Sequence, residues 1–177
     1  MQIGNIHGAS FDEYVWNDTW SGSPGAGATG GGISDYFDIP DYQKGAGVPA
    51  SLNDGKRIGR GCPDVAANAS PNSGFHVTVN GQSANGCGTS ASAPLWAGFI
   101  AVLNAGLGQN VGFVNPLIYS LGSAVFRDIV GAPGPADNGL YGVKGYPAGK
   151  GWDACTGWGS PNGAALLAAL KKAFHKA

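Results

Sequence analysis

Residues 86–108, GCGTSASAPLWAGFIAVLNAGLG, carry the strongest structural signal in the chain. The run Leu95–Leu107 has the length of a helix and is apolar on nearly all sides, which predicts a buried helix. Gly106 and Gly108 mark its expected end. The stretch therefore predicts a core helix preceded by a motif of small residues.

This motif, GTSASAP at residues 88–94, suits a nucleophilic serine. A nucleophile needs an exposed hydroxyl on a rigid support; glycine tolerates a tight turn before it, and small neighbours leave space for a substrate. Because Pro94 is acceptable only in a first helical turn, Ser90 is expected at the N-terminus of the helix. Free N–H groups and the helix dipole favour an oxyanion there. The spacing fits a serine that only caps the helix equally well.

Segments outside this stretch predict short strands and further helices. Residues 75–80 alternate in polarity, and Asn80-Gly81 is a strong hairpin signal. A short helix is predicted over residues 114–121. The glycine-rich segment 21–34 is either a surface turn or a backbone segment that a ligand or another chain approaches closely. Short strands and buried helices with glycine-rich connections favour an α/β fold.

The chain ends in a predicted amphipathic helix. Ser160-Pro161 is typical of an N-cap followed by proline at the first helical position. One face of the helix carries Leu166, Leu167, Leu170 and Phe174. Lys171, Lys172 and Lys176 complement the dipole at its C-terminal end.

Composition narrows the function classes. Glycine makes up 32 of 177 residues, about 18% against a usual 7%, and charged residues make up 12% against about 25%. There is no basic stripe, so nucleic acid is a poor partner. No apolar run reaches about 18 residues, so no membrane span is expected, and no signal peptide opens the chain. Few charges limit self-repulsion in acid, so the composition suits an acidic medium.

Three cysteines, Cys62, Cys87 and Cys155, allow at most one internal disulfide. A bond between Cys62 and Cys87 is possible, but spacing does not give geometry. No C-x-x-C is present, which disfavours zinc.

Several ordered motifs resemble the sedolisin family, the kumamolisin-like serine-carboxyl peptidases, over nearly the whole chain. They are Val15-Trp16-Asn17-Asp18, Gly30-Gly31-Gly32-Ile33-Ser34 with Phe37, Pro40, Tyr42 and Gln43, Arg60-Gly61-Cys62-Pro63-Asp64-Val65-Ala66-Ala67, GTSASAPLWAG, Gly149-Lys150-Gly151-Trp152-Asp153, and Cys155-Thr156-Gly157-Trp158-Gly159-Ser160-Pro161. The resemblance implies a subtilisin-like α/β fold, a parallel-sheet sandwich with helices on both faces. It further implies that residues 1–177 are the C-terminal portion of the catalytic domain.

The same resemblance implies a serine-type endopeptidase that hydrolyses peptides or proteins in acid, with Ser90 as nucleophile. Sedolisins activate this serine with a Glu oriented by an Asp, and a protonated Asp stabilises the oxyanion. Such carboxyl groups work where histidine is already protonated. The Glu-x-x-x-Asp and Ser-Gly-Asp motifs that carry them are absent here, and Glu13, the only Glu, is given no catalytic role. The chain alone is therefore expected to be inactive, with the missing N-terminal part of the domain or a second copy completing the site.

A calcium site is implied within the loop region at about 122–160. The family binds one structural Ca²⁺ through an Asp, the next carbonyl, two glycine carbonyls and a second Asp. The matching positions here are Asp128, Ile129, Gly149, Gly151 and Asp153. Carboxylate and carbonyl oxygens are the hard ligands that calcium prefers.

Two alternatives remain open. A subtilase-like hydrolase would need a histidine base, and none of His7, His76 or His175 has a convincing context. A non-catalytic, calcium-stabilised structural or binding module would need no base at all. Asp64, in the Pro-Asp-Val-Ala segment, is expected to be a hydrogen-bonded structural residue.

Overall fold

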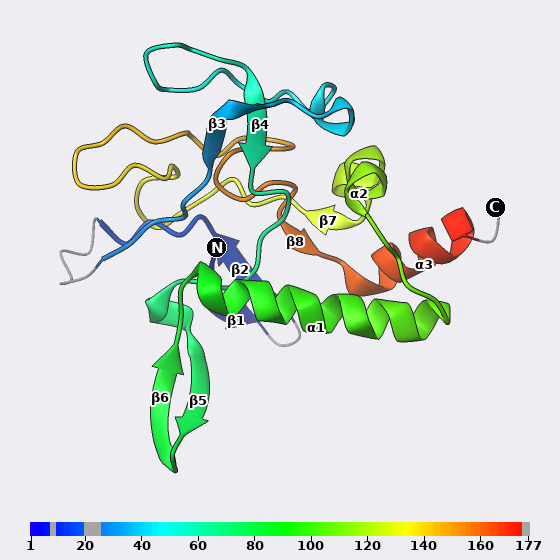
Figure 1. Ribbon diagram of the computed structural model, residues 1–177. Coiled ribbons are helices and arrows are strands. Elements are labelled where there is room, and N and C mark those ends of the chain that lie inside the picture. The colour runs from blue at the N-terminus through cyan, green and yellow to red at the C-terminus, as the bar shows by residue number, and fades with distance from the viewer. Residues whose placement is uncertain (8–9, 20–25, 175–177) are drawn as a thin grey trace.

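The computed structural model describes residues 1–7, 10–19 and 26–174, and Figure 1 shows their arrangement. Residues 21–25 of the glycine-rich segment, His175 and Lys176 lie outside this range. The elements are β1 (Gln2–His7), β2 (Ser10–Tyr14), β3 (Gly32–Asp38), β4 (Gly59–Cys62), β5 (Phe75–Val79), β6 (Gln82–Gly86), α1 (Thr89–Leu107), α2 (Asn115–Leu121), β7 (Phe126–Arg127), β8 (Ser160–Pro161) and α3 (Gly163–Phe174).

The described strands pair as four two-stranded antiparallel sheets, β1 with β2, β3 with β4, β5 with β6, and β7 with β8. The mixture of helices and strands confirms the α/β class. No parallel pair occurs among these strands, so the parallel sheet of the expected sandwich is not formed within the described part of the chain.

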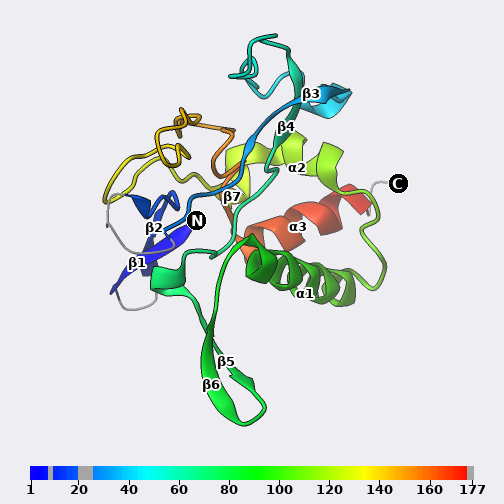
Figure 2. The same cartoon turned by 60° about the vertical axis from the view of Figure 1, so that its left-hand side comes forward.

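The main core gathers around α3, which lies between α1 and α2 in Figure 2. Leu166 and Leu170 of α3 are buried, and Leu103 of α1, Ile118 of α2 and Trp152 belong to the same cluster. The face predicted for the last helix is confirmed, because Leu167 and Phe174 also pack against this cluster. Lys171 and Lys172 are exposed in its last turn.

The start of α3 corrects the expected cap. Ser160 and Pro161 form strand β8, and the helix begins at Gly163. Asn162 takes the capping role, because its Oδ1 accepts from the N–H of Ala165 at 3.1 Å. Proline at 161 fits a two-residue strand as well as a first helical turn. The Ser-Pro pair alone therefore does not distinguish a strand from the start of a helix.

Helix α1 has the predicted length, and Gly108 ends it in the left-handed conformation with φ +71°. The prediction that it is buried is wrong, because Leu103 is its only buried residue. Leu95 is 48% exposed and Val102 69% exposed. One side of α1 packs against α3, and no described element covers the opposite side.

The same helix corrects the expectation about membrane spans. By length and composition alone, α1 is long and apolar enough to cross a bilayer. The prediction that no segment spans a membrane counted only unbroken runs of apolar residues. The mean hydropathy along the helix stays high although residues 89–94 include small polar ones. One such helix is weak evidence for a membrane protein, because core helices pass the same test.

The hairpin prediction is confirmed. Asn80 and Gly81 both have positive φ, 52° and 77°, and connect β5 to β6. This conformation matches a two-residue turn that follows the twist of the strands. The hairpin extends away from the core next to the start of α1 (Figure 1), and the short helix predicted near 114–121 is α2.

In the described part of the glycine-rich segment, the backbone of this chain itself approaches closely, instead of the ligand or second chain that the sequence analysis considered. A Cβ at Gly31 would overlap the carbonyl oxygen of Ala154, so only glycine allows the two backbones to meet. The three cysteines are free; Cys62 and Cys87 are exposed and Cys155 is buried.

Candidate active-site serine and calcium loop

Ser90 is the second residue of α1 and is exposed to solvent. Gly88 occupies the N-cap position with φ +83°, a conformation that glycine adopts without strain. Its N–H donates to the carbonyl of Ala69 at 2.6 Å, which fixes the turn against the preceding segment. Because Gly88 takes the cap, the interpretation of Ser90 as a mere capping residue does not fit.

Pro94 differs from its expected place by one turn. It lies inside α1, at the sixth helical position, instead of in the first turn. Proline has no N–H to donate to the carbonyl four residues earlier, which is that of Ser90. The placement of Ser90 at the helix N-terminus is nevertheless as predicted.

The start of α1 is anchored by its neighbours and leaves Ser90 unengaged. Ser92 Oγ donates to the carbonyl of Asn68 at 2.8 Å, and Trp96 Nε1 donates to that of Ala66 at 3.1 Å. Within residues 1–7, 10–19 and 26–174, the Ser90 hydroxyl has no hydrogen-bond partner. The arrangement presents a free hydroxyl at a rigid helix end, where backbone N–H groups favour negative charge.

No described side chain is positioned as its base. His7 lies 3.3 Å from Asp12 on the β1–β2 hairpin, and the Glu13 carboxylate pairs with Arg127 at 2.8 Å. Asp18 is buried and accepts from Trp16 Nε1 at 2.6 Å and from Ser70 Oγ at 3.0 Å. These partners give each group a structural role.

Asp64 is hydrogen-bonded as expected of a structural residue. Its carboxylate accepts from Arg60 at 2.6 Å, Asn115 at 2.9 Å and the Tyr119 hydroxyl at 2.7 Å. Burial is the main cause of the raised pKa of Tyr119, so its hydroxyl stays a donor. The cluster joins β4 to α2.

The five predicted calcium ligands lie in two segments that meet. The Gly151 N–H donates to Asp128 Oδ2 at 2.7 Å, and the Gly149 N–H donates to Asp153 Oδ2 at 3.0 Å. Ile129 is 1% exposed and follows Asp128 directly. A glycine with φ +88° at 151 permits the tight path of the loop.

The donor set fits a hard cation. Asp128 Oδ1 is buried without a hydrogen-bond partner, and neither Asp128 nor Asp153 has an ion pair in the described ranges. Burial raises the pKa of Asp153 despite hydrogen bonds from Gly149, Thr156 and Cys155. A buried carboxylate oxygen without a donor is costly unless a cation or water satisfies it. Among the described residues no three His, Cys, Asp or Glu side chains cluster, so backbone carbonyls would have to complete the shell.

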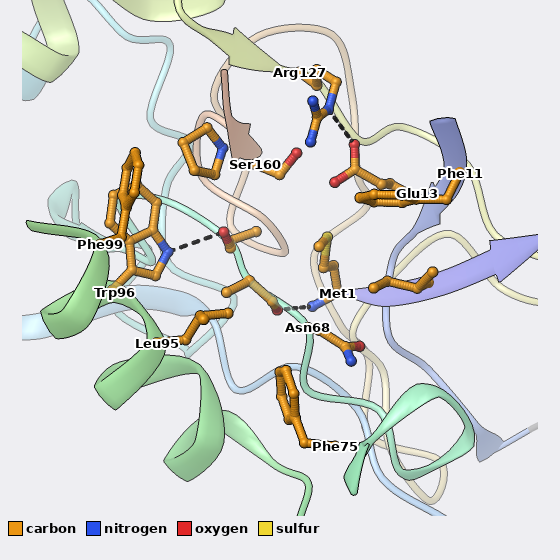
Figure 3. A pocket seen from close by; sticks show the side chains of 14 residues that line it. Met1, Phe11, Glu13, Asn68, Phe75, Leu95, Trp96, Phe99, Arg127 and Ser160 are labelled. Atoms are coloured by element: carbon orange, nitrogen blue, oxygen red, sulfur yellow. Dashed lines mark hydrogen bonds and ion pairs between the residues drawn. The ribbon is translucent and has the colours of Figure 1, made fainter. Parts of the chain in front are cut away.

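Sequence reasoning missed an apolar pocket between the N-terminal hairpin and α1, shown in Figure 3. Its volume is about 280 Å³, and Phe11, Phe75, Trp96 and Phe99 supply aromatic walls. Glu13 and Ser160 bring polar atoms to it from β2 and β8. The single Glu of the chain was the available signal, but nothing in the sequence placed it beside Arg127.

No family model matches the chain, but several known proteins are similar to it. Kumamolisin from Bacillus sp. (strain MN-32) is 47% identical over 158 residues, which cover 89% of this chain and 27% of that protein. Sedolisin from Pseudomonas sp. (strain 101) is 34% identical over 165 residues, 93% of this chain and 26% of its own length. The aorsin of Aspergillus oryzae (strain ATCC 42149 / RIB 40) is 35% identical over 76% of this chain and 23% of its own.

A solved structure shares the fold. It is Pseudomonas sedolisin, a serine-carboxyl proteinase complexed with two molecules of pseudo-iodotyrostatin, with a TM-score of 0.77 and 30% identity. The match covers 97% of this chain and 45% of that structure. Of the full lengths of kumamolisin, sedolisin and aorsin, by contrast, the chain spans only about a quarter.

Proposed function

Since the chain belongs to the sedolisin family, we propose that residues 1–177 form the C-terminal portion of a sedolisin-like catalytic domain and supply Ser90 as the nucleophile of an acid-acting endopeptidase. The supporting observation is the free Ser90 hydroxyl at the anchored start of α1. Its substrates would be peptides or proteins. The low charge of the chain suits an exported enzyme in an acidic medium.

In the proposed reaction, Ser90 Oγ attacks the scissile carbonyl carbon and its proton passes to a carboxylate base. The carbonyl oxygen becomes an oxyanion, and N–H groups at the start of α1 lie where they can donate to such a charge. Loss of the leaving amine, which takes up a proton, gives an acyl-enzyme that water then hydrolyses. Gly88 and Ser92 hold the helix end in place and take no part in the proton transfer.

The base, its orienting Asp and the oxyanion acid are proposed to come from outside this chain. No Glu-x-x-x-Asp pair is present, and the chain covers less than half of the related solved structure. The missing N-terminal part of the domain is the proposed source, with a second copy as the other candidate.

The test is peptide hydrolysis from about pH 3 to about pH 8, with Ser90→Ala as control. The chain is assayed alone and together with the N-terminal part of the kumamolisin catalytic domain. We expect no cleavage by the chain alone and acid-optimal, Ser90-dependent cleavage by the mixture. Cleavage by the mixture that survives Ser90→Ala would contradict the nucleophile assignment. Loss of the activity in acid and gain near neutrality would favour the histidine-dependent alternative.

A non-catalytic module is the second candidate, favoured by the lack of any base beside Ser90 among the described residues. It predicts that Ser90→Ala changes no property of the chain, with or without the complementing part. It also predicts that folding and calcium binding persist without hydrolysis.

We further propose one structural Ca²⁺ held by the carboxylates of Asp128 and Asp153 and by the carbonyls of Ile129, Gly149 and Gly151. The unpartnered Asp128 Oδ1 supports this assignment, as does the absence, within the described ranges, of an ion pair to Asp128 or Asp153. The ion would tie segment 128–129 to segment 149–153 and play no part in proton transfer. Isothermal titration with calcium should show one site, which Asp128→Ala abolishes.

A further inference from the structure

The hydrogen bonds that hold the start of α1 end on one short stretch, residues 66–70, which we call the support segment. The Gly88 N–H, Ser92 Oγ and Trp96 Nε1 donate to carbonyls of this segment at 2.6, 2.8 and 3.1 Å, and Figure 3 shows the bond from Trp96. All five residues of the segment are buried, with exposed fractions from 0% to 8%. The position of Ser90 therefore depends on where the support segment lies.

Asp18 contacts the last residue of the support segment, Ser70. Its Oδ2 accepts from Ser70 Oγ at 3.0 Å, and its Oδ1 accepts from Asn72 Nδ2 at 2.9 Å. Trp16 Nε1 donates to Oδ2 at 2.6 Å, and the Asp18 N–H donates to the carbonyl of Gly27 at 2.8 Å. The carboxylate thus joins the end of the support segment to the chain that follows β2.

A carboxylate suits this place better than an amide or an apolar side chain. An ionised Asp accepts hydrogen bonds at both oxygens, whereas an Asn would turn an NH₂ group toward a donor. Asp18 is 2% exposed, and burying a charge costs free energy that an apolar side chain of similar size would not. Hydrogen bonds to a charged acceptor are short and strong. What the carboxylate provides is therefore a fixed direction for the hydroxyl of Ser70 and the amide of Asn72.

We propose that Asp18 is a positioning residue for Ser90. Asp18 fixes Ser70, which directly follows Ala69. The carbonyl of Ala69 accepts from Gly88, two residues before Ser90, so a shift of the support segment moves the nucleophile. A displacement of about 1 Å at a reacting group can cost about 10²-fold in rate. The inference rests on the proposed function and adds to it a residue that touches neither the substrate nor the reacting atoms.

Asn17 is the matched control for Asp18. It is the preceding residue and has the same exposed fraction, 2%. Its side-chain amide donates to the carbonyls of Asp137 at 2.9 Å and Gly139 at 3.1 Å, so it holds a loop that is not part of the support segment. Loss of either side chain should destabilise the chain, but only a change of the carboxylate should reach Ser90.

Amide hydrogen exchange in the chain alone measures this positioning without catalysis. The readout is the exchange rate of the Gly88 N–H divided by that of Leu103, the buried residue of the same helix, so that global unfolding cancels. Asp18→Asn should raise this ratio about tenfold or more, because it removes hydrogen bonds to a charged group and lets the support segment open locally. Asn17→Ala should change the ratio by less than about twofold.

Asn72→Ala is a milder variant that tests the same contact. Asn72 is exposed, so its truncation leaves the core intact and removes one donor to Asp18. We expect the exchange ratio to rise about threefold. Circular dichroism and thermal melting establish that each variant folds, and if Asp18→Asn does not fold, the ratio in Asn72→Ala decides in its place.

Kinetics of the complemented enzyme separate positioning from a merely structural role. With the N-terminal part of the kumamolisin catalytic domain added, Asp18→Asn should lower kcat about tenfold or more and leave KM within about twofold, because the nucleophile moves while the groups that bind substrate stay in place. Asn17→Ala should leave both constants within about twofold. Titration of the reactive Ser90 corrects for any loss of folded enzyme.

The outcomes distinguish the positioning role from the proposed function. An exchange ratio that rises in Asp18→Asn and not in Asn17→Ala, together with the loss in kcat, supports the role. If the mixture hydrolyses no peptide, the proposed function falls, and the exchange ratio still decides whether Asp18 holds the turn before Ser90. A ratio unchanged in Asp18→Asn, a rise of the same size in Asn17→Ala, or an active mixture whose kcat does not change in Asp18→Asn overturns the proposal.

Discussion

Helices α1 and α3 pack against each other, yet they use apolar residues differently. Helix α3 is one-sided, with Leu166 and Leu170 buried at 1% and 0% exposure and Lys171 and Lys172 in its last turn. Helix α1 has no charged residue, and Leu103 is its only buried position. The same core accepts one face of each helix.

The contrast shows how the distribution of apolar residues sets the packing that a helix needs. A helix with apolar residues on one side needs one covering surface, and a helix with apolar residues all round needs two. This chain supplies the single surface for α3 and one of two for α1. The apolar pattern of α1 can therefore be recognised in the sequence, although no element of the described residues covers its second side.

The three cysteines lie in different environments: Cys62 and Cys87, in the region before α1, are exposed, whereas Cys155, in segment 153–156, is buried. Burial raises the pKa of Cys155 to about 12 from an ordinary 9.0, and its thiol donates to the carbonyl of Tyr146 at 3.0 Å. Because a raised pKa keeps a thiol neutral, its thiolate fraction at about pH 8 falls roughly a thousandfold. We expect Cys62 and Cys87 to react rapidly with a thiol reagent and Cys155 to react at least about a thousandfold more slowly.

Labelling in denaturant supplies the control, since all three thiols should then react alike. Three equally fast thiols in the native chain would contradict the packing of segment 153–156.

The raised pKa of Cys155 also predicts that the stability of the chain depends on pH. The folded chain favours the neutral Cys155 thiol, so its contribution is present below the ordinary pKa and is lost as the pH rises from about 9 toward 12.

Core truncation compares the two helices directly. Leu170→Ala should lower the free energy of unfolding by about 2–5 kcal/mol, because Leu170 is fully buried and its removal leaves a cavity. Val102→Ala on α1 should change it by no more than about 0.5 kcal/mol. Urea unfolding followed by circular dichroism measures both. A similar loss for both variants would show that α1 is covered in solution and would end the comparison.

Calcium removal tests the proposed ion site between segments 128–129 and 149–153. At a free calcium concentration of about 100 times the dissociation constant, binding should stabilise the chain by about 2.7 kcal/mol. A chelator should remove this stabilisation, and Asp128→Ala should make the chain insensitive to the chelator. Asp54→Ala, at an exposed residue of the 51–57 loop, is the control that keeps the response. A chelator response in Asp128→Ala would move the site elsewhere.

Local signals in the sequence predicted much of this structure. Asn80-Gly81 specified its turn because both residues tolerate positive φ, and Gly108 specified the end of α1 for the same reason. The motif around Ser90 placed that serine at a helix start. The family resemblance grouped Asp128 and Asp153 with Gly149 and Gly151, whose N–H groups donate to these carboxylates. Each of these features depends on residues near one another in the chain or on a motif of the family.

Features that depend on distant contacts could not be predicted. Glu13 and Arg127 are separated by 114 residues, so nothing local reveals their ion pair. The exposure of α1 depends on which other elements the chain contains, and hydrophobicity alone does not report that. The predicted cap of α3, Ser160, was wrong, because Ser160 and Pro161 pair with β7 as a strand and Asn162 caps the helix instead.

The side-chain cap of α3 makes a small contribution to stability that can be measured. Asn162→Ala removes the acceptor for the Ala165 N–H and should destabilise the chain by about 1 kcal/mol. Because Asn162 is exposed, the change disturbs no core packing. Asn162→Asp keeps an acceptor at the helix start and should retain most of the stability. Urea unfolding of the two variants decides the point: an equal loss from both would show that α3 depends on its buried leucines alone, whereas the expected split shows that α3, unlike α1 with Gly88, begins at a side-chain cap.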